Sequence, residues 1–265
     1  MLIAQITDLH ILPQGELAYG RVDTAACLAR AVSRLLTMEP RPDLVVATGD
    51  LVDAGSAREY AHLRRLLAPL ELPLYLLPGN HDSRDGLRAA FPDHNYLPQS
   101  GTFLQYCIED WPVRLIALDT IIPGEPGGRL CDERLAWLSD RLSEQTDRPT
   151  LIMMHHPPFA TGIGHMDHMG LAEPEALAAI LRRHSNVARV ICGHDHRSIQ
   201  AGFAGTIASV APSTAHQVML DLTTDAEARY VLEPPGFHLH LWRASSGMAT
   251  HTAFVDRYPG PYPFT

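Results

Sequence analysis

Cysteine is scarce in this chain. Four cysteines occur in 265 residues, and their wide spacing forms no C-x-x-C pair: Cys27, Cys107, Cys131 and Cys192. This spacing argues against a disulfide-stabilised scaffold and against a zinc ribbon. The simplest expectation is therefore a protein of the reducing cytoplasm.

Long apolar runs are also lacking. No run approaches the ~20 residues that cross a bilayer. The first strand is expected from Leu2 onward, which leaves no room for a secretory leader. We therefore expect no membrane partner.

Positive charge is limited as well. The chain has 21 lysines and arginines against 30 acidic residues, a formal net charge of -9, and no stripe rich in Lys or Arg. Such a chain should repel long nucleic acids. Cations bound inside a site would reverse the local field, so a small anionic substrate remains compatible with this composition.

The first two hundred residues alternate short apolar runs with amphipathic stretches. This order predicts an α/β fold with parallel strand pairs and helical crossovers. Ser56 is expected to cap the second helix. Helices are expected near residues 22–38, 56–68, 132–144 and 173–184, with further strands near 102–108 and 113–119.

Beyond about Arg197 the segments become short, β-rich and separated by Gly, Pro and Ser. We expect them to form a second sheet packed on the first, followed by a small extension. The expected division is a catalytic domain over residues 1–222 and a β-rich extension with a Pro-rich tail over 223–265. The tail should pack on the catalytic domain or on a neighbouring subunit, so a homo-oligomer, a dimer or larger, is expected.

Side chains of metal-ligand type follow five of the apolar runs. Because parallel strands end at one edge of a sheet, five such strand ends predict one site. Mixed nitrogen and oxygen ligands suit Zn, Mn, Fe or Co, and two such ions ~3.5–4 Å apart would clamp a phosphoryl group. Any one motif is weak, but the ordered set is strong. The clusters are Asp8-x-His10, Gly49-Asp50-x-x-Asp53, Gly79-Asn80-His81-Asp82, His155-His156-Pro157-Pro158 and Gly193-His194-x-His196.

This ordered set, spanning residues 8–196, resembles the calcineurin-like metallophosphoesterase superfamily. Within it the chain is most similar to class III cyclic-nucleotide phosphodiesterases and related bacterial glycerophosphodiesterases. The resemblance implies a four-layer αββα sandwich, two divalent transition-metal ions (Mn, Fe, Zn or Co) and hydrolysis of small phosphodiesters. The supporting details are Tyr19-Gly20, the MHHPP run at 154–158, Met166-Asp167 and His216-Gln217.

The resemblance also implies roles for individual residues. Asp50 would bridge the two metals, and His155 rather than His156 would be a ligand, a choice that spacing alone leaves open. Asp53 is expected to support a ligand rather than to be one. The first metal would take Asp8, His10, Asp50 and His196, and the second Asp50, Asn80, His155 and His194.

His81 would contact the phosphate and help the leaving oxygen depart, with Asp82 orienting it. Four further side chains are expected to border the substrate: Tyr19, His165, His168 and His216. For His165 and His168 the alternative is a solvated loop. The alternating strand patterns predict that His238, His240 and His251 face solvent.

Three functions could use a chain with these motifs. The leading one is a phosphodiesterase acting on glycerophosphodiesters, cyclic nucleotides or related small diesters. A phosphomonoesterase or nucleotide pyrophosphatase on the same centre is the alternative. An inactive scaffold is disfavoured because all seven implied ligand positions and His81 are present.

Overall fold

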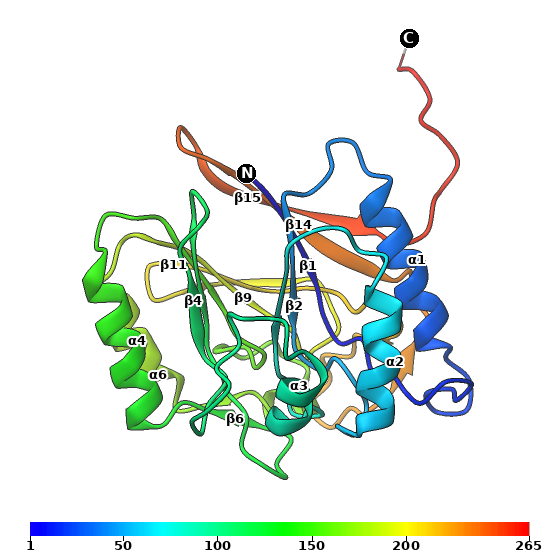
Figure 1. The fold of residues 1–265 in the computed structure, drawn as a ribbon, viewed down its shortest axis with the longest axis horizontal. Coiled ribbons are helices and arrows are strands. Elements are labelled where there is room, and N and C mark those ends of the chain that lie inside the picture. Colours follow the sequence, from blue (N-terminus) through cyan, green and yellow to red (C-terminus); the bar gives the residue numbers. More distant parts are fainter. Residues whose placement is uncertain (265) are drawn as a thin grey trace.

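Two β-sheets face each other, with helices on both outer sides. The computed structural model describes residues 1–264; residue 265, the end of the predicted tail, lies outside them. Figure 1 shows α1 and α2 covering one sheet, and α4 and α6 covering the other. The predicted four-layer αββα fold is confirmed.

The first sheet has the order β15-β14-β1-β2-β3. Its parallel strands are β1 (Leu2–Ile6), β2 (Leu44–Thr48) and β3 (Leu74–Leu77), and its antiparallel strands are β14 (Gly236–Arg243) and β15 (Gly247–Phe254). The helices between the parallel strands are α1 (Thr24–Leu36) and α2 (Ala57–Leu67), followed by α3 (Arg84–Ala90).

The second sheet has the order β10-β11-β9-β7-β5-β4. Its strands are β4 (Tyr106–Ile108), β5 (Arg114–Ala117), β7 (Thr150–Met153), β9 (Val187–Cys192), β10 (Ile199–Phe203) and β11 (Thr206–Val210). Its helices are α4 (Asp132–Glu144) and α6 (Pro174–Leu181), with the one-turn α5 (Gly164–Asp167) before β8. Two small pairs complete the described chain: β6 (Gly128–Arg129) with β8 (Leu171–Ala172), and β12 (Gln217–Val218) with β13 (Tyr230–Val231).

The four expected helices are present, and their ends follow the local chemistry. The Ser56 hydroxyl accepts a hydrogen bond from Glu59 N at 3.3 Å, and the Glu59 carboxylate accepts one from Ser56 N at 2.8 Å. This capping box starts α2 where the sequence predicts it. The short helices α3 and α5 were not predicted, because 7 and 4 residues are too few for a clear helical periodicity.

The C-terminal strands are divided between both sheets, so the expected separate second sheet beyond Arg197 is wrong. β10 and β11 extend the sheet that contains β9, whereas β14 pairs with β1 in the first sheet. The reason is that β1 and β9 each need a second neighbour, and later strands provide it. The tail after β15 extends away from the sheets in Figure 1.

Two strand histidines that were predicted to face solvent are buried. His238 and His240 in β14 are fully shielded, while His251 in β15 is exposed as predicted. His238 Nε2 lies 2.9 Å from Ser198 Oγ, and His240 Nε2 lies 3.0 Å from Gln5 Oε1. The alternating sequence pattern wrongly predicted that both side chains are exposed, because the face of β14 that carries them packs between the two sheets.

Acid is expected to destabilise the protein through His238. Burial, together with the nearby Arg189 charge, lowers the pKa of His238 to about 4, so the unfolded chain takes up a proton before the folded one does. Stability is therefore full above about pH 6.5 and falls as the pH drops towards 4, by ~2 kcal/mol at about pH 5.

Urea unfolding of the wild type and of His238→Gln, both with chelator, measures this effect. The stability difference between the two proteins should shrink by ~2 kcal/mol between about pH 7 and pH 5. A difference that stays constant with pH would show that His238 titrates normally.

Candidate metal centre

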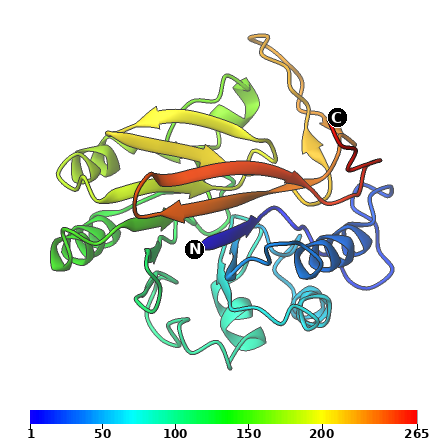
Figure 2. The ribbon, with the colours of Figure 1, turned by 90° about the horizontal axis from the view of Figure 1, so that it is seen from above.

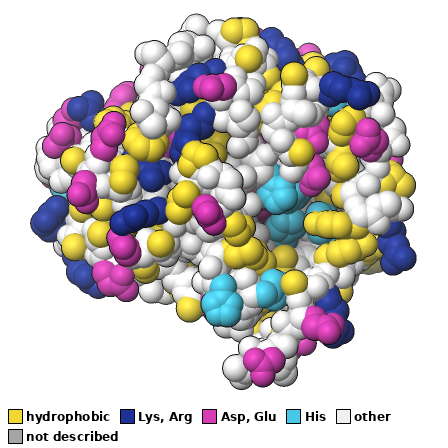
Figure 3. Space-filling view, turned by 90° about the horizontal axis from the view of Figure 1, so that it is seen from below, with side chains coloured by type: hydrophobic (Ala, Val, Ile, Leu, Met, Phe, Trp, Pro, Cys, Tyr) yellow, Lys and Arg dark blue, Asp and Glu magenta, His cyan; other side chains and the backbone are white. Residues whose placement is uncertain are grey.

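The five predicted clusters meet at one edge of the sheets. They lie in the loops that follow β1, β2, β3, β7 and β9, and their ligand atoms form groups within 4.8 Å of one another. Figure 3 shows histidine side chains gathered in a hollow on this face, next to hydrophobic side chains. The groups that contain only predicted ligands are Asp8 with His10 and His196, and Asp8 with Asp50 and His155.

Most of the candidate ligands sit on strained backbone. Non-glycine residues rarely adopt positive φ, which costs of order 1–3 kcal/mol each. Hydrogen bonds hold the strained segments in place, among them Asp8 N to Gly49 O and His10 N to Asp50 O, both 3.0 Å. Five of the seven predicted ligands have positive φ: Asp8 (52°), His10 (43°), Asp50 (48°), His194 (77°) and His196 (52°).

Loop geometry rather than strand alternation brings Asp8 and His10 to one place. β1 ends at Ile6, and left-handed turns direct both side chains inward. The D-x-H spacing therefore reflects the loop that follows the strand.

His10 and His196 present facing lone pairs. Their Nε2 atoms are 3.1 Å apart. His10 Nδ1 lies 3.2 Å from an Asp53 carboxylate oxygen, and His196 Nδ1 lies 3.0 Å from the His216 carbonyl oxygen. Each Nδ1 therefore carries the proton, which leaves both Nε2 atoms as acceptors. Two lone pairs this close repel each other unless a proton or a metal ion lies between them, so this group fits a metal.

A second group of acceptors surrounds Asn80. His155 Nδ1 donates to the Thr48 carbonyl oxygen at 2.8 Å, so Nε2 carries the lone pair when the ring is neutral. That atom lies 3.1 Å from the Asn80 amide oxygen, which is also 3.1 Å from His194 Nδ1. Although burial opposes it, Asp50 raises the pKa of His155 to about 9. The group thus attracts a positive charge, and a metal ion would displace that proton.

Asp50 reaches both groups. Its Oδ1 lies 3.3 Å from His155 Nε2, and its Oδ2 lies 3.6 Å from His10 Nε2. Burial opposes ionisation, but the charges of His155 and His10 hold the pKa of Asp50 well below its usual range. A Cβ at Gly79 would lie 2.2 Å from Asp50 Oδ1, so the bridging position depends on glycine there.

His156 is held elsewhere. Its Nδ1 lies 2.7 Å from the Thr120 hydroxyl, and its Nε2 lies 3.1 Å from the Pro126 carbonyl oxygen. Both nitrogens are engaged, although proximity also groups this ring with His155 and His194. Because a metal ligand needs a free lone pair, these two hydrogen bonds favour His155 over His156 as the ligand.

Asp82 does not orient His81 as predicted. His81 Nδ1 is held by the Asp53 carbonyl oxygen at 2.6 Å, which leaves Nε2 toward the cavity. The Asp82 carboxylate instead accepts hydrogen bonds from Leu51 N, Gly79 N and the Tyr60 hydroxyl. It ties the loops after β2 and β3 together, so it positions the ligand loops rather than His81.

The cavity above the two groups has a volume of about 340 Å³. Of the residues predicted to border substrate, Tyr19, His81, His165 and His216 line it. His168 is exposed and is not among the lining residues, so its solvated-loop alternative fits better. Motif reading missed several lining residues because they belong to no metal cluster: Pro126, Met166, Met169, Val218, Ala228, Arg229 and Tyr230.

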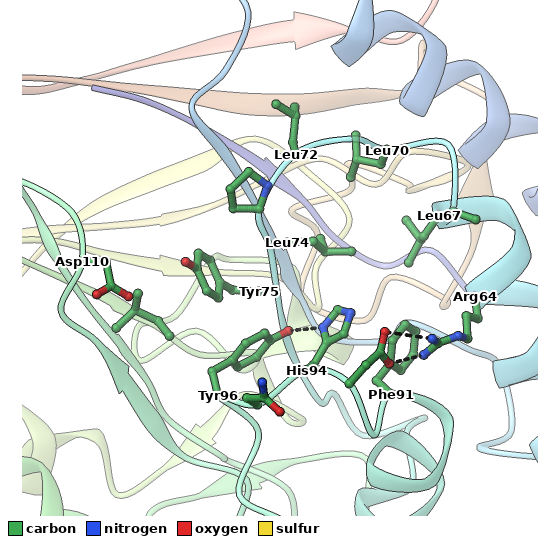
Figure 4. Close-up of a pocket in the computed structure, with 15 residues that line it drawn as sticks. Arg64, Leu67, Leu70, Leu72, Leu74, Tyr75, Phe91, His94, Tyr96 and Asp110 are labelled. Atoms are coloured by element: carbon green, nitrogen blue, oxygen red, sulfur yellow. Dashed lines mark hydrogen bonds and ion pairs between the residues drawn. The ribbon is translucent and has the colours of Figure 1, made fainter.

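A larger cavity of about 540 Å³ opens beside β3 (Figure 4). Its main polar side chains already pair with each other, Arg64 with Asp93 at 2.6 Å and His94 with Tyr96 at 2.9 Å. Within residues 1–264 no metal-type group includes any residue lining it. The smaller cavity beside the metal-type side chains is therefore the candidate functional site, although the cavity beside β3 has the larger volume.

Two acceptor groups that share one carboxylate, set at strand ends of an αββα sandwich, define the class of binuclear metallohydrolases. Comparison with known proteins identifies the family. Residues 1–198 match the family model for calcineurin-like phosphoesterases, and the chain belongs to this family, as the sequence motifs predicted.

Curated relatives span nearly the same length. The chain is 39% identical over 265 residues to a probable glycerophosphodiester phosphodiesterase of Arcobacter nitrofigilis, covering 100% of this chain and 97% of that protein. It is 31% identical to a 3′,5′-cyclic adenosine monophosphate phosphodiesterase of Escherichia coli K12, covering 81% of this chain and 76% of that protein. The protein is thus a phosphoesterase, a hydrolase.

Solved structures support the fold. A dimetal phosphatase from Danio rerio superposes with a TM-score of 0.63 at 16% identity, covering 97% of this chain and 99% of that one. Across the described residues, every helix is too short or too polar to traverse a bilayer.

Proposed function

We propose that this protein hydrolyses small phosphodiesters, glycerophosphodiesters and cyclic nucleotides among them, using two divalent transition-metal ions. The observation that carries the proposal is the position of Asp50, whose two oxygens face two separate groups of acceptors. The relatives named as glycerophosphodiester and cyclic-nucleotide phosphodiesterases support the same substrates.

The protein side chains provide positions and protons. Asp8, His10, Asp50 and His196 would hold one ion, and Asp50, Asn80, His155 and His194 the other. When bound, the ions supply Lewis acidity and an activated water. Thr48, Asp53 and His216 fix the ligand imidazoles through their Nδ1 atoms. His81 Nε2 contacts the phosphate and delivers a proton to the leaving oxygen.

Three further proposals concern the setting of the enzyme. The ligand types favour Mn, Fe, Zn or Co. The free state of the four cysteines supports a cytoplasmic location. The exposed aromatic side chains Tyr258, Tyr262 and Phe264 in the tail support self-association through this segment.

Metal analysis combined with turnover tests the proposed function. We expect about two transition-metal ions per chain, loss of activity on bis(p-nitrophenyl) phosphate after chelation, and recovery when metal returns. Hydrolysis of p-nitrophenyl phosphate, measured in parallel, should be slower. Faster monoester hydrolysis, or no activity with any of Mn, Zn, Fe and Co, would overturn the proposal.

A further inference from the structure

The β12–β13 ribbon, defined as residues 217–231 and including the segment that joins the two strands, forms one side of the metal cavity. Four of its residues line the cavity, Val218, Ala228, Arg229 and Tyr230, and none belongs to the metal clusters. Figure 2 shows the segment between these strands extending away from the two sheets. The ribbon is thus a separate element that contacts whatever enters the site.

Arg197 fixes this ribbon relative to the metal ligands. It follows His196 directly, and its Nη1 donates to the Val218 carbonyl oxygen at 2.6 Å and pairs with Glu233 at 2.8 Å. One contact reaches β12 and the other reaches Glu233, just after β13. The ribbon is therefore held at a defined distance from His196. A side chain on β13 can therefore act as a fixed wall of the cavity.

An aromatic surface runs from the ligands to the ribbon. The rings of Tyr19 and Tyr230 stack with centroids 4.7 Å apart and an interplanar angle of 22°. Both rings meet His216 edge-on, at 5.3 and 5.6 Å, and His216 lies 4.7 Å from His196. Tyr19 is 64% exposed, so this pair retains accessible aromatic surface at the mouth of the cavity.

Another part of the cavity lining is apolar and adaptable. Pro126, Met166 and Met169 line it, and methionine side chains conform to differently shaped apolar groups. The lining cation outside the metal groups, Arg229, is paired with Glu227 at 3.0 Å. The side chains of Pro126, Met166 and Met169 offer no hydrogen-bond partner to the hydroxyls of a polyol, whereas a planar ring would gain contact area against them.

We propose that Tyr230, supported by Tyr19, determines specificity by packing against a planar aromatic group, such as a nucleobase, carried by the phosphodiester. This inference rests on the proposed function and deepens it. The metal ligands and His81 hold the phosphate, and the tyrosine pair selects what is attached to it. Diesters with an aromatic group are favoured over those with only small aliphatic groups.

Two substitutions of Tyr230 test the proposal with two substrates. Tyr230→Ala should lower kcat/KM for 3′,5′-cyclic AMP by ~10-fold, while Tyr230→Phe, which keeps the ring, should stay within about twofold of the wild type. Glycerophosphoethanolamine, which lacks an aromatic group, should change by less than about twofold with either variant. Equal losses on both substrates, or no loss on cyclic AMP, would overturn the specificity role.

A binding measurement separates this proposal from the proposed function. Calorimetric titration of the Mn-loaded protein with adenosine 5′-monophosphate should show ~10-fold weaker binding for Tyr230→Ala than for the wild type. Binding of glycerol 3-phosphate should be unchanged. If no diester is turned over, the proposed function fails, and these titrations still decide whether Tyr230 selects aromatic ligands.

Discussion

Asp50→Ala is expected to abolish phosphodiesterase activity and to remove at least one metal ion per chain. One of its oxygens faces His10 and the other faces His155, so its carboxylate serves both acceptor groups. Loss of partners that only support a ligand already costs ~10–100-fold in metal affinity or activity, so loss of a bridging ligand should exceed that range. Elemental analysis and diester turnover on the same preparation measure both effects.

Asp195→Asn is the matched control. Asp195 lies between His194 and His196 and is as buried as Asp50, but its carboxylate belongs to none of the metal-type groups. This variant should keep its metal content and most of its activity. If the Asp50 variant retains two ions per chain, the bridging assignment is wrong, whatever happens to turnover.

The meeting of the candidate ligands at one edge of the sheets could be predicted from the sequence because each cluster is short and follows a recognisable buried strand. Asp50, for example, comes directly after Val45–Thr48 and a glycine, so its place at a strand end follows from local pattern alone. Helix α4 was predictable for a similar reason, since thirteen residues display a full amphipathic face. Local signals of this kind need no knowledge of distant partners.

The remaining features depend on contacts between distant parts of the chain. Nothing local shows that β14 pairs with β1, more than 230 residues away, and buries His238 and His240 between the sheets. Likewise, Tyr230 belongs to no motif, and contacts with distant residues, among them the anchoring of its ribbon by Arg197 and its stacking on Tyr19, bring it to the cavity. The positive φ values of the ligands also escaped prediction, because they result from the surrounding hydrogen bonds.

His81→Ala is expected to keep the metal content while lowering turnover by ~10²–10⁴-fold, the range of a positioned acid–base group. The His81 ring is held through Nδ1, which faces the Asp53 carbonyl oxygen, and packs edge-on against the His10 ring with centroids 4.7 Å apart; its removal leaves all seven predicted ligands in place. Metal analysis and turnover of a dialkyl diester measure the two parts of this expectation.

The leaving group distinguishes proton delivery from simple binding of the phosphate. An alkoxide must gain a proton to depart, whereas p-nitrophenolate leaves readily without one. If His81 supplies that proton, His81→Ala should impair glycerophosphoethanolamine hydrolysis far more than bis(p-nitrophenyl) phosphate hydrolysis. Equal losses would assign His81 to phosphate binding alone, and loss of metal would place it among the ligands. Since Asp53 holds His10 through its carboxylate and His81 through its carbonyl, one residue orients both a predicted metal ligand and the proposed proton donor.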